Sequence, residues 1–143
     1  RAAGMTTIVN FMFGFPGEGV NELRNTLGLM EALAPHTDFF NNRGVLIPFP
    51  GTTVYDRWHA EYGFTRWWLD PDRQITEPDW QGMDYNEVQR TLEQDPTLDL
   101  DFFRYSDPVR AAIAGCVRFK ARHNRATLVS QSDGAGAAKR TGR

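Results

Sequence analysis

The sequence has a single cysteine, Cys116, among its 143 residues. One thiol excludes an internal disulfide framework, and it excludes a set of cysteines that could hold a zinc ion or an iron-sulfur cluster within this chain. The sequence also has no apolar run near the roughly 20 residues that span a bilayer, and no signal-peptide pattern at its start. We therefore expect a cytoplasmic protein without a membrane span.

Excess charge of either sign is small. The 16 basic and 18 acidic residues give a net charge of -2 at pH 7. This balance provides no general attraction to membranes or nucleic acids, so we do not expect a nucleic acid partner. Residues 1–4 (RAAG) read as the end of a helix followed by a C′ glycine, which predicts that the chain is the carboxyl-terminal part of something longer.

The sequence does contain the tripeptide Phe-Pro-Gly twice, at residues 15–17 and 49–51. Proline sets φ for the first central position of a tight turn, and glycine accepts the positive φ of the second. Each copy closes a strand-like run and opens a helix-like one. Two successive β-turn-α units follow, and ligands of α/β sheets and barrels bind at such strand ends.

The first strand is predicted from Thr6 to Phe13, where a nearly continuous apolar run indicates burial on both faces of a parallel sheet. Asn10 interrupts it and shares a face with Ile8 and Met12, so we expect its amide in a lumen or beneath packed helices. A satisfied core amide and a ligand contact both stay open for it. A weaker strand follows at about residues 38–47, with a bulge expected at the polar stretch 41–44.

Helical spacing of apolar residues predicts four helices. They cover about residues 20–34, 53–62, 84–92 and 107–124, the third starting at a capping box of Asp84 and Glu87. An aromatic-rich excursion without periodicity lies at 64–83. The expected organisation is therefore α/β: βα units in 1–63, a helical extension in 64–127 and a disordered tail in 128–143.

Together, these motifs carry a family resemblance. Residues 11–18 (FMFGFPGE) resemble the "F-x-F-G-x-P-G-E" strand and turn of radical SAM enzymes, and 47–52 (IPFPGT) resembles the "P-[YF]-P-G-T" turn found one unit later. The pair, in this order, is similar to the cobalamin-binding subclass. The resemblance covers residues 2–62 well and 63–125 more loosely. One departure is Gly19, which stands where the family has an N-cap threonine.

The resemblance implies the last units of a partial (β/α)6 TIM-type barrel that binds S-adenosylmethionine, a 4Fe-4S cluster and, in this subclass, cobalamin. The cluster-binding CxxxCxxC loop is not in this chain, so the fragment alone is expected to be inactive. The implied partners are the upstream part of the polypeptide and a small-molecule substrate. The implied cofactor-binding residues are Asn10, Met12, Gly14, Phe15, Pro16, Gly17 and Glu18, and the implied substrate-cavity rim is Pro48, Phe49, Pro50, Gly51 and Thr52.

Simpler structural roles are predicted for several of these and other residues. Glu18 is expected to complement the dipole of the helix that it begins rather than to bind a ribose hydroxyl. Cys116 fits a small core residue. The tryptophans are expected to pack the extension on the barrel, or to form a wall for a large flat substrate. A basic run (Arg118, Lys120, Arg122 and Arg125) fits a solvated helix face, with a phosphate contact as the alternative.

Two other functions stay open beside the radical SAM reading. One is a non-catalytic α/β binding or interaction module that has no cluster in any form. The other is an enzyme of a different barrel family that uses the same turns for a phosphorylated substrate.

Overall fold

The structure is a computed structural model that describes residues 5–70, 84–96 and 101–138. Its elements are the strands β1 (Ile8–Val9) and β2 (Phe39–Phe40), the helices α1 (Val20–Leu33), α2 (Thr53–Trp58), α3 (Tyr85–Gln94) and α4 (Asp107–Ala138), and the 3-10 turns η1 (Ala34–His36) and η2 (Trp67–Leu69). This confirms an α/β chain with a helical extension. The described part forms a two-stranded sheet, and no barrel is seen in it.

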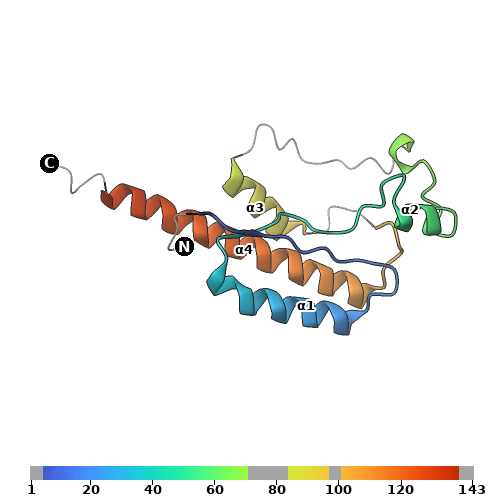
Figure 1. Cartoon of the computed structure of the whole chain (residues 1–143), viewed down its shortest axis with the longest axis horizontal. Helices are drawn as coiled ribbons and strands as arrows, with labels where there is room; N and C mark the ends of the chain where they lie inside the picture. Colours follow the sequence, from blue (N-terminus) through green and yellow to red (C-terminus); the bar gives the residue numbers. More distant parts are fainter. Residues whose placement is uncertain (1–4, 71–83, 97–100, 139–143) are drawn as a thin grey trace.

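The two strands are parallel, as predicted. Ile8 pairs with Phe39 and Val9 with Phe40, and the pairing resumes downstream as a bridge from Phe13 to Val45. Both strands run toward the end of the molecule where α2 lies (Figure 1). The two Phe-Pro-Gly turns therefore follow strands that end on the same side.

A β-bulge separates the two paired stretches, as predicted for residues 41–44. Four residue steps join Val9 to Phe13, whereas five join Phe40 to Val45. The side chain of Asn41 fills the gap, since its Oδ1 accepts the Phe11 N–H at 2.9 Å and its Nδ2 donates to the Phe11 carbonyl at 2.9 Å. A side-chain amide thus continues the ladder where the backbone departs from it.

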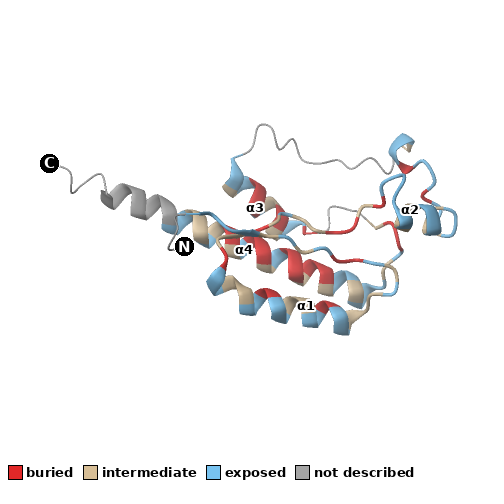
Figure 2. Ribbon diagram, in the orientation of Figure 1, coloured by how far each residue is buried: buried red, intermediate tan, exposed pale blue. Residues whose placement is uncertain are grey.

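Helices cover one face of this sheet. α4 lies between α1 and α3, and buried residues gather along it (Figure 2). Phe13, Phe40, Leu23 and Val117 are buried in the main core. Cys116 belongs to the same core, which confirms its prediction as a small packing residue.

The other face of the sheet is open, so the prediction of a strand buried on both faces is wrong for this chain. Ile8 is 63% exposed, Met12 is 57% exposed, and Asn10 between them is also exposed. The predicted core role of Asn10 fails with it. The reason is that the described helices all pack on the side of Val9 and Phe13, leaving nothing to cover the alternate residues.

The helices begin where the sequence predicts. Gly19 precedes α1 without a side-chain cap, and Asp84 caps α3 by accepting the Glu87 N–H at 2.9 Å. α2 is shorter than predicted, ending at Trp58, because the chain turns toward Phe64. α4 runs through Ala138, so residues 128–138 are helical where a disordered tail was predicted. Extending an existing helix fixes one residue per added hydrogen bond, which explains the difference.

Lys120 corrects another prediction. It was expected on a solvated helix face, but it is fully buried. Its Nζ donates to the Arg43 carbonyl at 2.7 Å and to Asn41 Oδ1 at 3.2 Å, and it lies 4.7 Å from the centre of the Phe13 ring. Both acceptors belong to the bulge, so the spacing of residues within α4 could not predict the burial of Lys120.

Some predictions fall outside the described residues. These are the helix end at 1–4, the part of the aromatic excursion at 71–83 that contains Trp80, and the last residues of the tail. Within the described helices, none combines the length and the hydropathy that a membrane crossing needs.

Candidate functional site

The two Phe-Pro-Gly segments adopt the same turn. The Glu18 N–H donates to the Phe15 carbonyl at 3.0 Å, and the Thr52 N–H donates to the Phe49 carbonyl at 3.2 Å. The central glycines have positive φ, +85° for Gly17 and +81° for Gly51. A proline first and a positive-φ glycine second define a type II turn, so the predicted repetition of hinges is confirmed.

Glu18 holds the first hinge together. Its carboxylate accepts the N–H of Gly14 at 2.5 Å and that of Phe15 at 3.2 Å. The side chain therefore folds back onto the strand end that precedes it. This is a structural role, in line with the simpler prediction for Glu18, although it differs in detail from compensation of a helix dipole.

Gly14 lies against Tyr105 rather than against open space. The Tyr105 hydroxyl donates to the Gly14 carbonyl at 2.5 Å. A Cβ on Gly14 would stand 2.5 Å from the hydroxyl oxygen of Tyr105. Gly14 also has φ of +86°. The missing Cβ was predicted to admit a planar ligand, but in this structure it admits a tyrosine of the helical extension.

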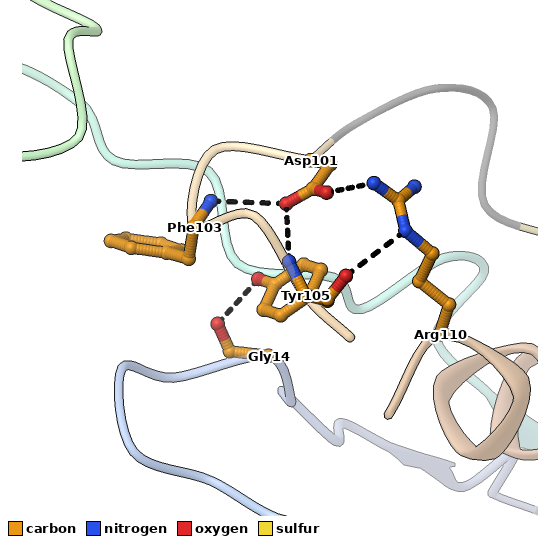
Figure 3. Close-up of polar contacts among 5 residues, drawn as sticks. All are labelled: Gly14, Asp101, Phe103, Tyr105 and Arg110. Carbon is orange, nitrogen blue, oxygen red and sulfur yellow. Dashed lines mark hydrogen bonds and ion pairs between the residues drawn. The ribbon is translucent and has the colours of Figure 1, made fainter. Parts of the chain in front are cut away.

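A tight turn at residues 101–105 presents that tyrosine (Figure 3). Asp101 Oδ1 accepts the N–H groups of Phe103 and Tyr105, both at 3.1 Å, and the other carboxylate oxygen pairs with Arg110. The Arg110 Nε donates to the Tyr105 carbonyl at 3.2 Å. Burial raises the pKa of Tyr105 well above its usual value, with the Asp101 and Glu18 charges adding to the effect, so the hydroxyl stays a donor.

The second hinge packs on aromatic rings. The buried Trp67 indole donates from Nε1 to the Pro48 carbonyl at 2.9 Å, and the Phe49 ring lies 5.9 Å from the Trp67 ring. Thr52 caps α2 by accepting the Tyr55 N–H at 3.2 Å. Trp67 also contacts Phe102, with ring centroids 5.1 Å apart, so residues 101–105 touch the surroundings of both hinges.

The open face of the sheet adjoins the first hinge. It presents Ile8, Asn10 and Met12 along β1 and its continuation, followed by Phe15, which is partly exposed in the turn itself. No hydrogen bond joins Asn10 or Met12 to the rest of the described chain. Among the described residues, nothing therefore occupies one edge and one face of this strand, which leaves them to a partner or a ligand.

The opposite edge of the sheet is closed. Asn124 of α4 accepts the Phe40 N–H at 2.8 Å through Oδ1 and donates to the Phe40 carbonyl at 3.0 Å through Nδ2. The same amide donates to Gln89 Oε1 at 3.1 Å. Asn124 therefore stands where a further strand would pair with β2.

All but one of the predicted site residues fall into two groups. Gly14 and Glu18 are engaged within the protein, as are Pro48 and Thr52, whereas the exposed members are available to a ligand: Asn10, Met12, Phe15, Gly17, Phe49, Pro50 and Gly51. Pro16 is half-buried in its turn. Sequence reasoning missed Asp101, Tyr105 and Arg110. The only signal was a cluster of aromatic residues before the α4 cap, which shows no period.

Comparisons with protein-family models, with curated proteins and with solved structures found no match for this chain.

Proposed function

We propose that this chain forms the last two βα units of a radical SAM barrel, where it lines the cavity for S-adenosylmethionine and the substrate. The observation that carries the proposal is the pair of identical type II turns after two parallel strands, in the motif order of that superfamily. On this reading the open face with Asn10 and Met12 is the barrel lumen.

The two edges of the sheet support the same assignment. Asn124 blocks the edge of β2, so the sheet cannot grow beyond β2 on that side. The edge at Asn10 and Met12 has no partner within the described chain. In an open barrel the last strand has an outer edge without a strand partner, and the strand before it pairs with a neighbour from the preceding unit. β2, whose outer edge Asn124 covers, fits the first position, and β1 fits the second.

The residues of this chain suit the three implied cofactors to different degrees. The cluster does not fit here, because Cys116 is buried, its sulfur lies 3.7 Å from the Leu23 carbonyl, and burial raises its pKa to about 11. S-adenosylmethionine fits better, since the exposed Asn10 amide and the turn at Gly17 offer polar groups and open backbone beside apolar surface. Cobalamin has no assigned position in this chain.

A direct test measures S-adenosylmethionine binding to the protein encoded by the complete reading frame, by isothermal titration calorimetry. Asn10→Ala is expected to weaken binding several-fold, because the ligand loses the hydrogen bond that the exposed Asn10 amide would make to it. Asn25→Ala, at an exposed position of α1, is the matched control. Equal affinity of both variants would contradict the assigned role of the open face.

The second candidate is a non-catalytic α/β binding module. It is favoured by the number of hinge groups that are already engaged, since Glu18, Gly14 and Thr52 all bond within the chain. On this account the complete protein would bind neither a cluster nor S-adenosylmethionine, and the open face would take another protein segment.

A further inference from the structure

A groove of about 520 Å3 runs between α3 and α4, away from the hinge turns. Its lining comes from successive turns of both helices: Asn86, Arg90, Glu93, Arg122, Arg125, Ala126 and Val129. The size is within the range of small-molecule sites. Figure 1 shows α3 crossing α4 on the side of the strands' amino-terminal ends. This groove is therefore separate from the site proposed above.

Positive charge dominates the groove. Three guanidinium groups line it, and Glu93 is the one carboxylate among the described lining residues. Glu93 pairs with Arg122 at 2.8 Å and with Arg125 at 2.6 Å, and these contacts lower its pKa. One carboxylate cannot neutralise three arginines, so the groove keeps an excess of positive charge.

Arg90 is the least constrained of the three. Its guanidinium group makes no hydrogen bond or ion pair with the described residues, and the residue is exposed. Asp84, which lines an adjoining hollow, uses its carboxylate to cap the Glu87 N–H. No described acid of the groove is therefore committed to Arg90.

Two buried polar atoms of the lining also lack partners. They are the Nε of Arg125 and the side-chain oxygen of Asn86. Leaving such an atom unsatisfied costs about 1–3 kcal/mol. Both atoms are covered by surrounding side chains, so an oxyanion at Arg125 or a hydroxyl at Asn86 would satisfy them once these side chains shift on binding.

We propose that the α3–α4 groove binds a phosphate ester, with Arg90, Arg122 and Arg125 contacting the phosphate oxygens. Guanidinium groups match phosphate geometry with paired N–H donors. Glu93 orients Arg122 and Arg125 in the free protein and limits affinity by its negative charge. The phosphate ester comes either from a small molecule or from a nucleic acid backbone, which share this chemistry.

The test titrates the full chain with inorganic phosphate, adenosine 5′-monophosphate and a short single-stranded oligonucleotide, using calorimetry at low and at physiological ionic strength. Saturable binding of the phosphate probes is expected. Arg90→Gln should weaken it about tenfold, the equivalent of one charge-assisted hydrogen bond. Arg24→Gln, at an exposed arginine of α1, is the matched control and should leave affinity unchanged.

Glu93→Gln provides a readout that damage to the fold cannot imitate. Removing the only described carboxylate of the groove should strengthen phosphate binding severalfold. Binding of the oligonucleotide far above that of the monophosphate, with steep salt dependence, would identify a nucleic acid as the source. Similar affinities would identify a small phosphate ester. Equal binding by wild type, Arg90→Gln and Arg24→Gln, or no saturable binding, would overturn the proposal.

Discussion

At the scale of single residues, Lys120 is the one charged side chain that is fully buried among the described residues. Burial lowers its pKa from 10.5 to about 7, although it keeps acceptors at Arg43 and Asn41. Between these two values the folded protein binds fewer protons at this site than the unfolded chain does. Raising the pH within that interval therefore favours the folded state.

The first prediction follows from that sign. The free energy of unfolding should rise between pH 7 and about 9, by up to about 1 kcal/mol per pH unit. In Lys120→Met this rise should disappear. Urea unfolding at several pH values measures it. The rise in the free energy of unfolding should end near pH 9. Above that pH the Cys116 thiol ionises in the unfolded chain, whereas its pKa of about 11 keeps it protonated in the folded state, so the folded state loses stability. An identical pH slope in both proteins would contradict a buried, neutralised Lys120.

The second prediction concerns Gly14. Gly14→Ala should destabilise the fold by roughly 2–4 kcal/mol, because alanine disfavours φ of +86° and its Cβ would collide with the Tyr105 hydroxyl. Thermal unfolding by circular dichroism provides the measurement. Gly28→Ala is the control, since Gly28 is at an exposed position of α1 and a Cβ there would have nothing within 4 Å. That change should stabilise by about 0.5–1 kcal/mol. Similar effects of both substitutions would argue against the Tyr105 contact.

At the scale of elements, α4 organises the sheet. Its turn at Lys120 and Asn124 holds both the bulge and the outer edge of β2. Asn124 is fully buried and satisfies both backbone groups of Phe40. The helix thus performs the pairing that another strand would provide.

The third prediction tests this edge. Asn124→Ala should cost about 2–4 kcal/mol, because it leaves the buried N–H and carbonyl of Phe40 unpaired. Amide hydrogen exchange at Phe40 should accelerate. Asn25→Ala, at an exposed position on α1, should change neither quantity. If Phe40 remains protected in Asn124→Ala, another group must cover this edge.

The helices could be predicted from the sequence because their signals are local. The spacing from Val20 to Leu33 and the Asp84 capping box are written within a few residues, and both are confirmed. The burial of Lys120 and the open face at Met12 could not be predicted in this way. Both depend on which elements from distant parts of the chain pack together. An apolar run indicates a strand, but it does not indicate whether other elements pack on one face of that strand or on both.

At the scale of the whole molecule, the sheet exposes apolar surface beside an edge that has no strand partner in the described part of the chain. Ile8 and Met12 lie on this apolar surface, and β1 has no charged side chain that would oppose pairing with another strand. Edges of this kind associate with other chains.

The type II turns of the site could be predicted from the Pro-Gly pairs. The hydrogen bond from Tyr105 to Gly14 joins residues far apart in sequence, so no local pattern predicts it.

The fourth prediction is self-association through that surface. The isolated chain should form concentration-dependent oligomers or aggregates in sedimentation velocity, and Ile8→Lys should reduce them because a charge on an edge strand blocks pairing. Leu29→Lys is the control, since Leu29 is 53% exposed on α1, away from any strand edge. A chain that is monomeric at all concentrations, or equal effects of both substitutions, would contradict the open-edge account.

The central claim is that these two units complete a radical SAM barrel. The most direct measurement is to sequence the gene upstream of the codon for Arg1, far enough to cover the front of a barrel. The account predicts an in-frame CxxxCxxC after a strand-like segment. An in-frame start codon without that motif would contradict it and leave a cluster-free binding module as the function.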